Sequence, residues 1–308
     1  MAESGLVIVD KSGGMTSHDV VARIRRLAGT RKVGHAGTLD PMATGVLVIG
    51  VEKATRLLGH LTLTEKEYDA TIRLGQATVT DDAEGEIVPP SDGQGPDPAA
   101  IPEAELRTAL GAFTGQISQV PPRISAIKVD GERAYRLTRA GAAPELAARH
   151  VTITRLELLG IRAAGKRLLD LDVSVTCSSG TYIRAIARDL GAALGTGGHL
   201  TALRRTRVGP YGIARARTLD QLAATFELIP LADAAAAAFG CVHLSAEEAR
   251  LVSHGVRIPA ADGSAGATTS GRPAARDAPV AAFDPDGNLT ALLIRQGDEM
   301  RPLAVFVP

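Results

Sequence analysis

A short loop with two glycines carries the side chain that is best placed to do chemistry, the carboxylate of Asp40. Residues 34–41 read GHAGTLDP. The glycines allow backbone angles that other residues resist, and Pro41 disfavours helical angles at Asp40. We therefore expect the carboxylate on an extended segment between two elements, where functional groups tend to lie. A carboxylate in such a place can act as a nucleophile or as a general base.

The same dipeptide also fits a purely structural role, because Asp followed by Pro often begins a turn. For an arbitrary Asp-Pro pair this role is the favoured interpretation. The sequence has no GxxxxGK[ST] phosphate loop, no GxGxxG that opens a helix after a strand, and no HExxH or GxSxG signature. Its seven histidines do not cluster. We therefore expect no metal and no nucleotide cofactor.

Six sequence blocks along the chain favour a catalytic role of Asp40 over a structural one. They are DKSGGMTS at 10–17, GHAGTLDPMATGVLVIG at 34–50, Tyr68 followed by RLG at 73–75, SAIK at 125–128 with Gly131 and Tyr135, CSSGTYIR at 177–184, and Gly198-His199 with LRR at 203–205. Together they resemble the bacterial tRNA pseudouridine synthase B (TruB) family over roughly residues 5–228. Ser12 departs from the family pattern, which has Pro there, and Arg56 stands where many members have Lys.

The resemblance implies an isomerase that converts uridine 55 in the T-arm stem-loop of transfer RNA to pseudouridine. The reaction breaks the N1–C1′ bond, turns the uracil and rejoins it through C5, so it needs no cofactor. The implied catalytic residues are Asp40, Arg184, which pairs with Asp40, and Tyr68, which stacks on the target base. The base must be flipped out of folded RNA. The implied substrate-binding residues are His35, Arg56, Asp82, Tyr182 and Leu203.

Two other functions stay open at this point. One is an RNA chaperone that binds and refolds transfer RNA, and the other is a pseudouridine synthase that acts on another RNA. The step that Asp40 performs is open as well, since a carboxylate can attack C1′, add to C6 of the ring or remove the 2′ proton.

The charge pattern is compatible with an RNA partner even though the net charge is zero. Only six of the 34 basic residues are lysine, and arginine suits bidentate phosphate contacts. A GC-rich genome explains an arginine excess equally well. Basic residues gather between Arg23 and Lys32, and Arg204, Arg205 and Arg207 follow later, so we expect them to form one basic face with Arg56.

The composition also limits the compartment and the type of site. Cys177 and Cys241 are far apart in the sequence, which argues against a disulfide framework or a cysteine zinc site. The first residues lack the apolar segment of a signal peptide, and no apolar run approaches the roughly 20 residues of a membrane span. We expect a cytoplasmic, monomeric protein without membrane segments.

Hydrophobic periodicity predicts the elements that position these residues. Expected strands are 6–9, 46–51, 68–74, 151–161, 168–175, 199–208, 280–283 and 289–294, and expected helices are 17–27 with Ser17 as N-cap, 54–61, 102–113, 181–194 and 219–226. The mixed order and short turns favour an α+β fold on a largely antiparallel mixed sheet. Residues 1–235 are predicted to form a pseudouridine synthase-like catalytic domain. Residues 236–308 are predicted to form a small β-rich, PUA-like domain with a flexible insertion near 260–279.

Overall fold

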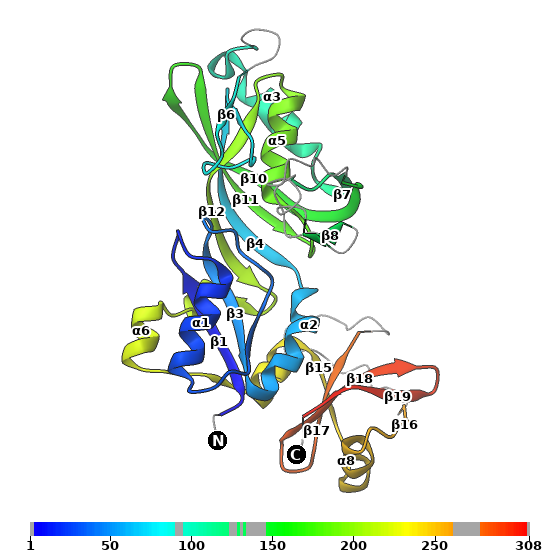
Figure 1. The fold of residues 1–308 in the computed structure, drawn as a ribbon. Helices are drawn as coiled ribbons and strands as arrows, with labels where there is room; N and C mark the ends of the chain where they lie inside the picture. The colour runs from blue at the N-terminus through cyan, green and yellow to red at the C-terminus, as the bar shows by residue number, and fades with distance from the viewer. Residues whose placement is uncertain are drawn as a thin grey trace. The chain divides into compact units, whose positions relative to one another are not determined.

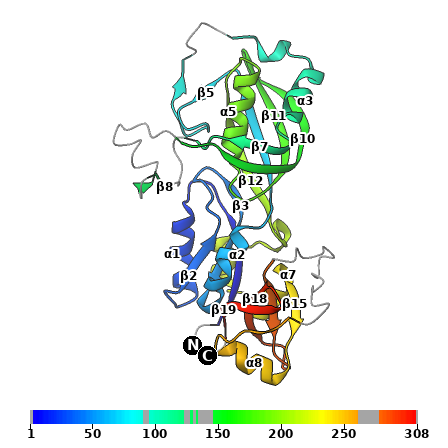
Figure 2. The ribbon, with the colours of Figure 1, turned by 90° about the vertical axis from the view of Figure 1, so that its right-hand side faces the viewer.

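The computed structural model describes residues 3–89, 95–122, 128–129, 132–133, 146–260 and 278–306. The chain forms two compact units. The first unit consists of Met1–Pro41, Gly45–Thr64 and Arg207–Pro308, and the second consists of Met42–Thr44 and Glu65–Thr206. The ribbon and its element labels are shown in Figure 1 and, turned by 90°, in Figure 2.

The first unit is built around β1 (Gly5–Lys11), which is almost entirely buried. This strand pairs antiparallel with β3 (Thr44–Val51) on one side and with β14 (Ile229–Pro230) on the other, and β3 also pairs with β2 (Val33–Ala36). Helix α1 (Ser17–Leu27) buries Val20, Val21 and Ile24. The other helices of this part are η1 (Glu52–Leu57), α2 (Leu58–Thr62), η3 (Ile213–Arg215), α6 (Leu219–Ala224) and α7 (Leu231–Ala238).

The C-terminal part of this unit is a five-stranded sheet in the order β15-β17-β18-β19-β16. The strands are β15 (Gly240–His243), β17 (Val280–Phe283), β18 (Leu289–Gln296), β19 (Glu299–Val305) and β16 (Ile258–Pro259), and helix α8 (Ala246–Ser253) contacts them. The β-rich character predicted for this region is therefore confirmed, although β19 was not predicted. The predicted insertion near 260–279 lies almost entirely outside the described residues.

One hydrophobic core joins the N-terminal strands to this C-terminal sheet. Leu6 of β1 and Leu57 of η1 belong to the same cluster of buried side chains as Ala234 of α7 and Phe283 and Leu292 of the C-terminal strands. The C-terminal segment thus shares its core with the start of the chain, a long-range contact that local periodicity does not reveal.

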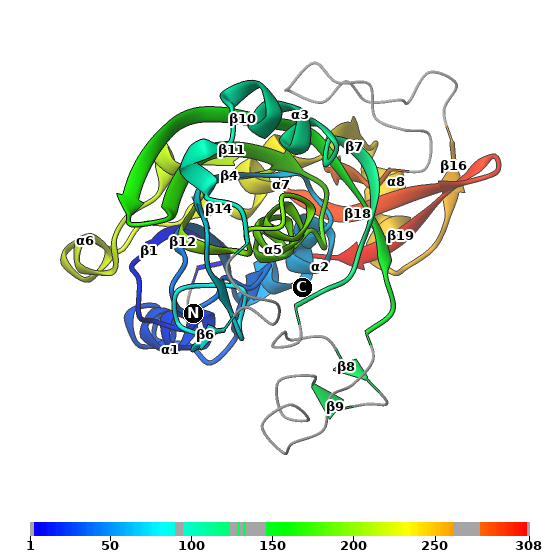
Figure 3. The same cartoon turned by 90° about the horizontal axis from the view of Figure 1, so that it is seen from above.

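The second unit contains strands in the order β12-β4-β11-β10-β7. They are β12 (Gly198–Val208), whose last two residues belong to the first unit, β4 (Lys66–Leu74), β11 (Leu168–Cys177), β10 (Arg149–Gly165) and β7 (Gly115–Gln119). The two long strands expected at 151–161 and 168–175 form an antiparallel pair. Helix α5 (Ile183–Ala193) contacts β4, and α3 (Glu103–Gly111) contacts both α5 and β10 (Figure 3). The predicted α+β fold on a largely antiparallel sheet is confirmed.

Short paired segments complete the second unit and the end of β12. They are β5 (Ala77–Thr78) with β6 (Ile87–Val88), β8 (Lys128–Val129) with β9 (Glu132–Arg133), and β13 (Tyr211–Gly212) with β12. A short helix, η2 (Pro98–Ala100), precedes α3. Two expected helices differ in detail. The one at 54–61 consists of a 3-10 turn followed by α2, and the one at 102–113 begins after Pro102, which is its N-cap residue.

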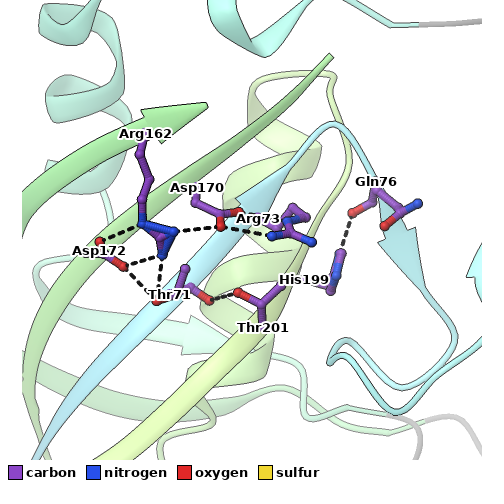
Figure 4. Close-up of polar contacts among 8 residues, drawn as sticks. All are labelled: Thr71, Arg73, Gln76, Arg162, Asp170, Asp172, His199 and Thr201. Atoms are coloured by element: carbon purple, nitrogen blue, oxygen red, sulfur yellow. Dashed lines mark hydrogen bonds and ion pairs between the residues drawn. The ribbon is translucent and has the colours of Figure 1, made fainter. Parts of the chain in front are cut away.

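A polar network connects three strands of the second unit (Figure 4). Because side chains alternate along a strand, Thr71 and Arg73 of β4 point away from the face that Tyr68 occupies. Arg73 donates two hydrogen bonds to Asp170 of β11, at 2.7 and 2.9 Å, and Arg162 of β10 forms an ion pair with the same carboxylate at 3.0 Å. This face is therefore held by cross-strand polar contacts.

Two further findings concern the described part of the chain only. None of its helices has the length and apolar character needed to cross a membrane. Within the same residues, no three His, Cys, Asp or Glu side chains lie together in a way that could hold a metal ion.

Candidate functional site

Asp40 lies in a loop between two elements, as predicted, although residues 34–36, which were expected to belong to this loop, form the end of strand β2. β2 ends at Ala36 and β3 begins at Thr44, and the two strands pair antiparallel, so the loop is the connection of a hairpin. Gly37 has a φ of 78°, a left-handed conformation that glycine adopts without strain. Leu39 is buried, whereas Asp40 is only half-buried. The carboxylate is thus held at the edge of the core and stays accessible.

The residue before Asp40 is fixed by Ser17 of α1. The Ser17 hydroxyl accepts a hydrogen bond from the Leu39 amide at 2.9 Å and lies 3.2 Å from the Leu39 carbonyl, to which it donates. Ser17 was predicted to be the N-cap of the helix, and this prediction is wrong. Thr16 is the N-cap, because its hydroxyl accepts from the Asp19 amide while the Asp19 carboxylate accepts from the Thr16 amide.

The residue after Asp40 is fixed by the segment that precedes α1. The carbonyl of Pro41 accepts from the Gly14 amide at 2.9 Å and from the Lys11 ammonium at 3.1 Å. Lys11 is completely buried and also donates to the carbonyls of Ser12 and Met15. Backbone contacts therefore hold both neighbours of Asp40, and a carboxylate that is placed in advance can react without first being ordered.

His35 and Arg56 also belong to the first unit. His35 lies on β2 with its ring edge-on to the ring of His18 in α1, at a centroid distance of 5.6 Å. Arg56 lies in η1 and donates a hydrogen bond to the carbonyl of Val305 in β19. The phosphate contact expected of Arg56 and the base-replacing role expected of His35 stay predictions.

Tyr68 and Leu203 lie on neighbouring strands of the second unit, β4 and β12, and both side chains are buried. Tyr182 is the N-cap residue of α5. Its amide donates to the side-chain oxygen of Gln119 at 2.8 Å, and its carbonyl accepts from the side-chain nitrogen of Gln119 at 3.1 Å. The buried Gln119 thus fixes the backbone of Tyr182 from the end of β7. Sequence reasoning missed Gln119, since its partner lies 63 positions away.

Arg184 and Asp82 form a buried ion pair in the second unit. The distance between the Arg184 guanidinium and the Asp82 carboxylate is 3.4 Å, and Arg184 also donates to the Thr80 carbonyl at 2.9 Å. Asp82 accepts further hydrogen bonds from the Glu84 amide at 3.1 Å and from the Thr80 hydroxyl. The structure therefore brings together two of the predicted site residues. The predicted pairing of Arg184 with Asp40 joins residues of different units and stays a prediction.

Two buried cations occupy positions beside Tyr68 and Leu203. Lys66 is two residues before Tyr68, and Arg205 is two residues after Leu203, so each cation shares the strand face of its neighbour. Lys66 is 5% exposed and Arg205 is 1% exposed. Burial and the charge of Arg205 lower the pKa of Lys66 to about 8. The prediction that Arg205 belongs to an exposed basic face is therefore wrong, because its strand position points it inward.

These side chains are suited to a flat, electron-poor ring. Tyr68 offers an aromatic face, Leu203 an apolar wall, and the two cations a positive potential that favours negative charge on a bound group. Cys177, which is opposite Lys66 in the strand register, does not provide a nucleophile. Burial raises the pKa of its thiol to about 11, so it stays protonated at neutral pH.

Comparison with known protein families gives three matches along the chain. Residues 25–183 match the family described as TruB family pseudouridylate synthase (N terminal domain). Residues 184–235 match the tRNA pseudouridylate synthase B C-terminal domain, and residues 239–307 match a family described as tRNA pseudouridine synthase II, C terminal. The three matches together cover most of the chain.

Individual relatives are proteins of the same family. The chain is similar to the tRNA pseudouridine synthase B of Thermobifida fusca, with 57% identity over 98% of both chains. It is also similar to the protein of that name from Arthrobacter sp., with 59% identity over 99% of this chain and 97% of the relative. Among solved structures, the chain is similar to a chain of a Cbf5-Nop10-Gar1 complex, with 27% identity and a TM-score of 0.71. The match covers 99% of this chain and 85% of that chain.

Proposed function

Because the chain belongs to the TruB family of pseudouridylate synthases, we propose that it converts uridine 55 in the T-arm stem-loop of transfer RNA to pseudouridine. The protein is an isomerase, since pseudouridine differs from uridine only in the atom through which uracil is joined to the ribose. One bond, N1–C1′, breaks and one bond, C5–C1′, forms. The proton of C5 leaves, and N1 gains a proton.

The placement of Asp40 is the observation that carries this proposal. The two residues that flank Asp40 are tied by their backbones to Ser17, Gly14 and Lys11, so the backbone that carries the carboxylate is held in place. A reaction at C1′ needs such a group, held without a cofactor, beside the ribose. We assign to Asp40 the role of catalytic carboxylate and to Arg184 the role of its cationic partner.

The remaining residues supply the pocket for the flipped base. Tyr68 stacks on the uracil, and Tyr182 and Leu203 form further walls. Asp82 orients Arg184 through their ion pair, in which the guanidinium and the carboxylate lie 3.4 Å apart. His35 fills the space that the extruded base leaves in the RNA, and Arg56 contacts phosphate. Flipping costs a few kcal/mol of stacking, which these contacts must offset.

The division of the chain into a catalytic domain at 1–235 and a C-terminal PUA-like domain at 236–308 is part of the proposal. It is supported by the separate five-stranded sheet and by the family match that begins at residue 239. A cytoplasmic location and a monomeric state stay predictions from the sequence, and light scattering in solution tests the second.

Tritium release tests the choice of substrate. A T-arm stem-loop labelled at C5 of its uridines should release tritium from the target position, because forming the C5–C1′ bond displaces the C5 hydrogen. The matched control is the same stem-loop with cytidine at the target position, which should release none. Absence of release from the uridine stem-loop, or equal release from the control, would contradict the proposed site.

A further inference from the structure

Helix α5 begins with Tyr182 and Arg184, the two residues of this helix that the proposed function uses. Arg188 lies one turn further along the same face, since residues four apart are neighbours on a helix surface. The loop after β5 presents two consecutive carboxylates to this face. Asp82 pairs with Arg184 at 3.4 Å, and Asp81 pairs with Arg188 at 3.3 Å. Two ion pairs in succession thus join one loop to one helix.

The guanidinium of Arg188 connects three separate parts of the second unit. Besides its contact with Asp81, it donates to the carbonyl of Val120 at 2.8 Å and to the carboxylate of Asp189 at 2.7 Å. Val120 directly follows Gln119, whose side chain exchanges two hydrogen bonds with the backbone of Tyr182. The start of α5 is therefore held by the end of β7 and by the loop at 81–82.

Asp81 has a backbone conformation that depends on such support. Its φ is 62°, in the left-handed region, which costs free energy in a residue other than glycine and persists only when surrounding contacts hold it. The same loop carries Asp82, so a change in the backbone at Asp81 moves the carboxylate that orients Arg184. Leu200 contributes one backbone hydrogen bond to this loop, from its amide to the Asp81 carbonyl at 3.1 Å.

We propose that Arg188 is a positioning residue of the reaction. It holds the loop at 81–82 and the end of β7 against α5, and thereby fixes Arg184 and Tyr182 without touching the substrate itself. The inference rests on the proposed roles of Arg184 and Tyr182. A shift of about 1 Å caused by a change away from the reacting atoms can lower a rate about a hundredfold.

The test compares Asp81→Asn and Arg188→Gln with the unchanged protein. Asn has the shape of Asp and also tolerates a positive φ, so Asp81→Asn removes the charge and little else. A full-length transfer RNA transcript with tritium at C5 of every uridine is the substrate, because its use does not depend on which uridine reacts. We expect each variant to lose about tenfold or more in single-turnover rate, while the Kd for the transcript stays close to that of the unchanged protein.

Three additional variants make the result specific to the Asp81–Arg188 contact. The double variant should be no slower than the slower single variant, because both changes remove the same ion pair. Asp189→Asn is the matched control, since it removes the partner within the helix and leaves the loop and β7 attached; its rate should be unchanged. Arg188→Lys keeps a positive charge toward Asp81 and should recover part of the rate.

Several results would overturn the inference. They are unchanged rates in Asp81→Asn and Arg188→Gln, losses that multiply in the double variant, and a loss in Asp189→Asn as large as in Arg188→Gln. If circular dichroism shows that Arg188→Gln does not fold, the single-turnover rates of Asp81→Asn and Arg188→Lys test the inference instead. Arg184→Gln separates failure of the proposed site from failure of the inference about Arg188. If Arg184→Gln reacts at the normal rate, the proposed site is wrong as well. If Arg184→Gln loses rate while the Asp81 and Arg188 variants react normally, only the inference about Arg188 is overturned.

Discussion

Lys66 is the buried lysine at the start of β4, and replacing it by methionine should stabilise the protein at neutral pH. Its side chain is 5% exposed, and burial and the charge of Arg205 lower its pKa from 10.5 to about 8. The charged form is therefore less favourable in the folded protein than in the unfolded chain, where the ammonium is hydrated. Methionine has a similar length and carries no charge, so it fits the same space.

The size of the effect follows from the two pKa values. Lowering the pKa of Lys66 from 10.5 to about 8 corresponds to a cost of about 3 kcal/mol at neutral pH. Between these pKa values the unfolded chain holds the proton that the folded protein has released, so the stability of the unchanged protein rises with pH in this window. The advantage of Lys66→Met should therefore shrink by roughly 2 kcal/mol between about pH 7 and pH 9.5.

Urea denaturation of both proteins at these two pH values measures the difference in free energy of unfolding. Titrating groups that do not interact with Lys66 contribute equally to both proteins and cancel. Lys166→Met is the control, because Lys166 is exposed in the turn between β10 and β11, so this change removes a lysine that is not buried. If the difference between Lys66→Met and the unchanged protein is the same at both pH values, the reasoning about Lys66 is refuted.

Two packing predictions follow from the close contacts of α5 and β13. Gly191→Ala would place a Cβ 2.2 Å from the backbone carbon of Gly197, and since backbone cannot yield cheaply, we expect a loss of about 3 kcal/mol in thermal unfolding. Gly111→Ala, whose Cβ meets no atom within 4 Å, should instead leave stability unchanged or raise it; equal effects of the two changes would contradict the packing. Tyr211→Phe removes a buried hydrogen bond to the Ala234 carbonyl of 2.7 Å and should cost about 1 kcal/mol in urea denaturation, so an unchanged free energy of unfolding would show that this bond is not needed.

Elements with a strong local pattern could be predicted from the sequence. The strand at 68–74 was recognised because buried and polar residues alternate along it, and the hairpin of β10 and β11 because two long strand patterns lie close together in the chain. β19 was missed, since Glu299, Arg301 and Pro302 interrupt its apolar pattern. Its pairing with β18 provides the stabilisation that its composition does not indicate.

The site was predictable only as far as the resemblance extended. Asp40, Tyr68 and Arg184 came from ordered sequence blocks, whereas the residues that hold them in place came from the structure. Gln119 reaches Tyr182 over 63 positions, and Arg188 reaches Asp81 over 107. No local rule of propensity or periodicity contains such contacts, because they depend on how distant strands and helices pack. Ser17 lies within a recognised block, but it was wrongly predicted to be an N-cap, because its partner Leu39 lies 22 positions away in the sequence.

The activity of Asp40→Asn tests the central claim most directly. The variant keeps the size of the side chain and the backbone contacts of Leu39 and Pro41, so its fold and its affinity for transfer RNA should be unchanged. We predict that it binds a tritiated transfer RNA transcript with the Kd of the unchanged protein and releases no tritium. Release of tritium at the unchanged rate would contradict the assignment of Asp40 as the catalytic carboxylate.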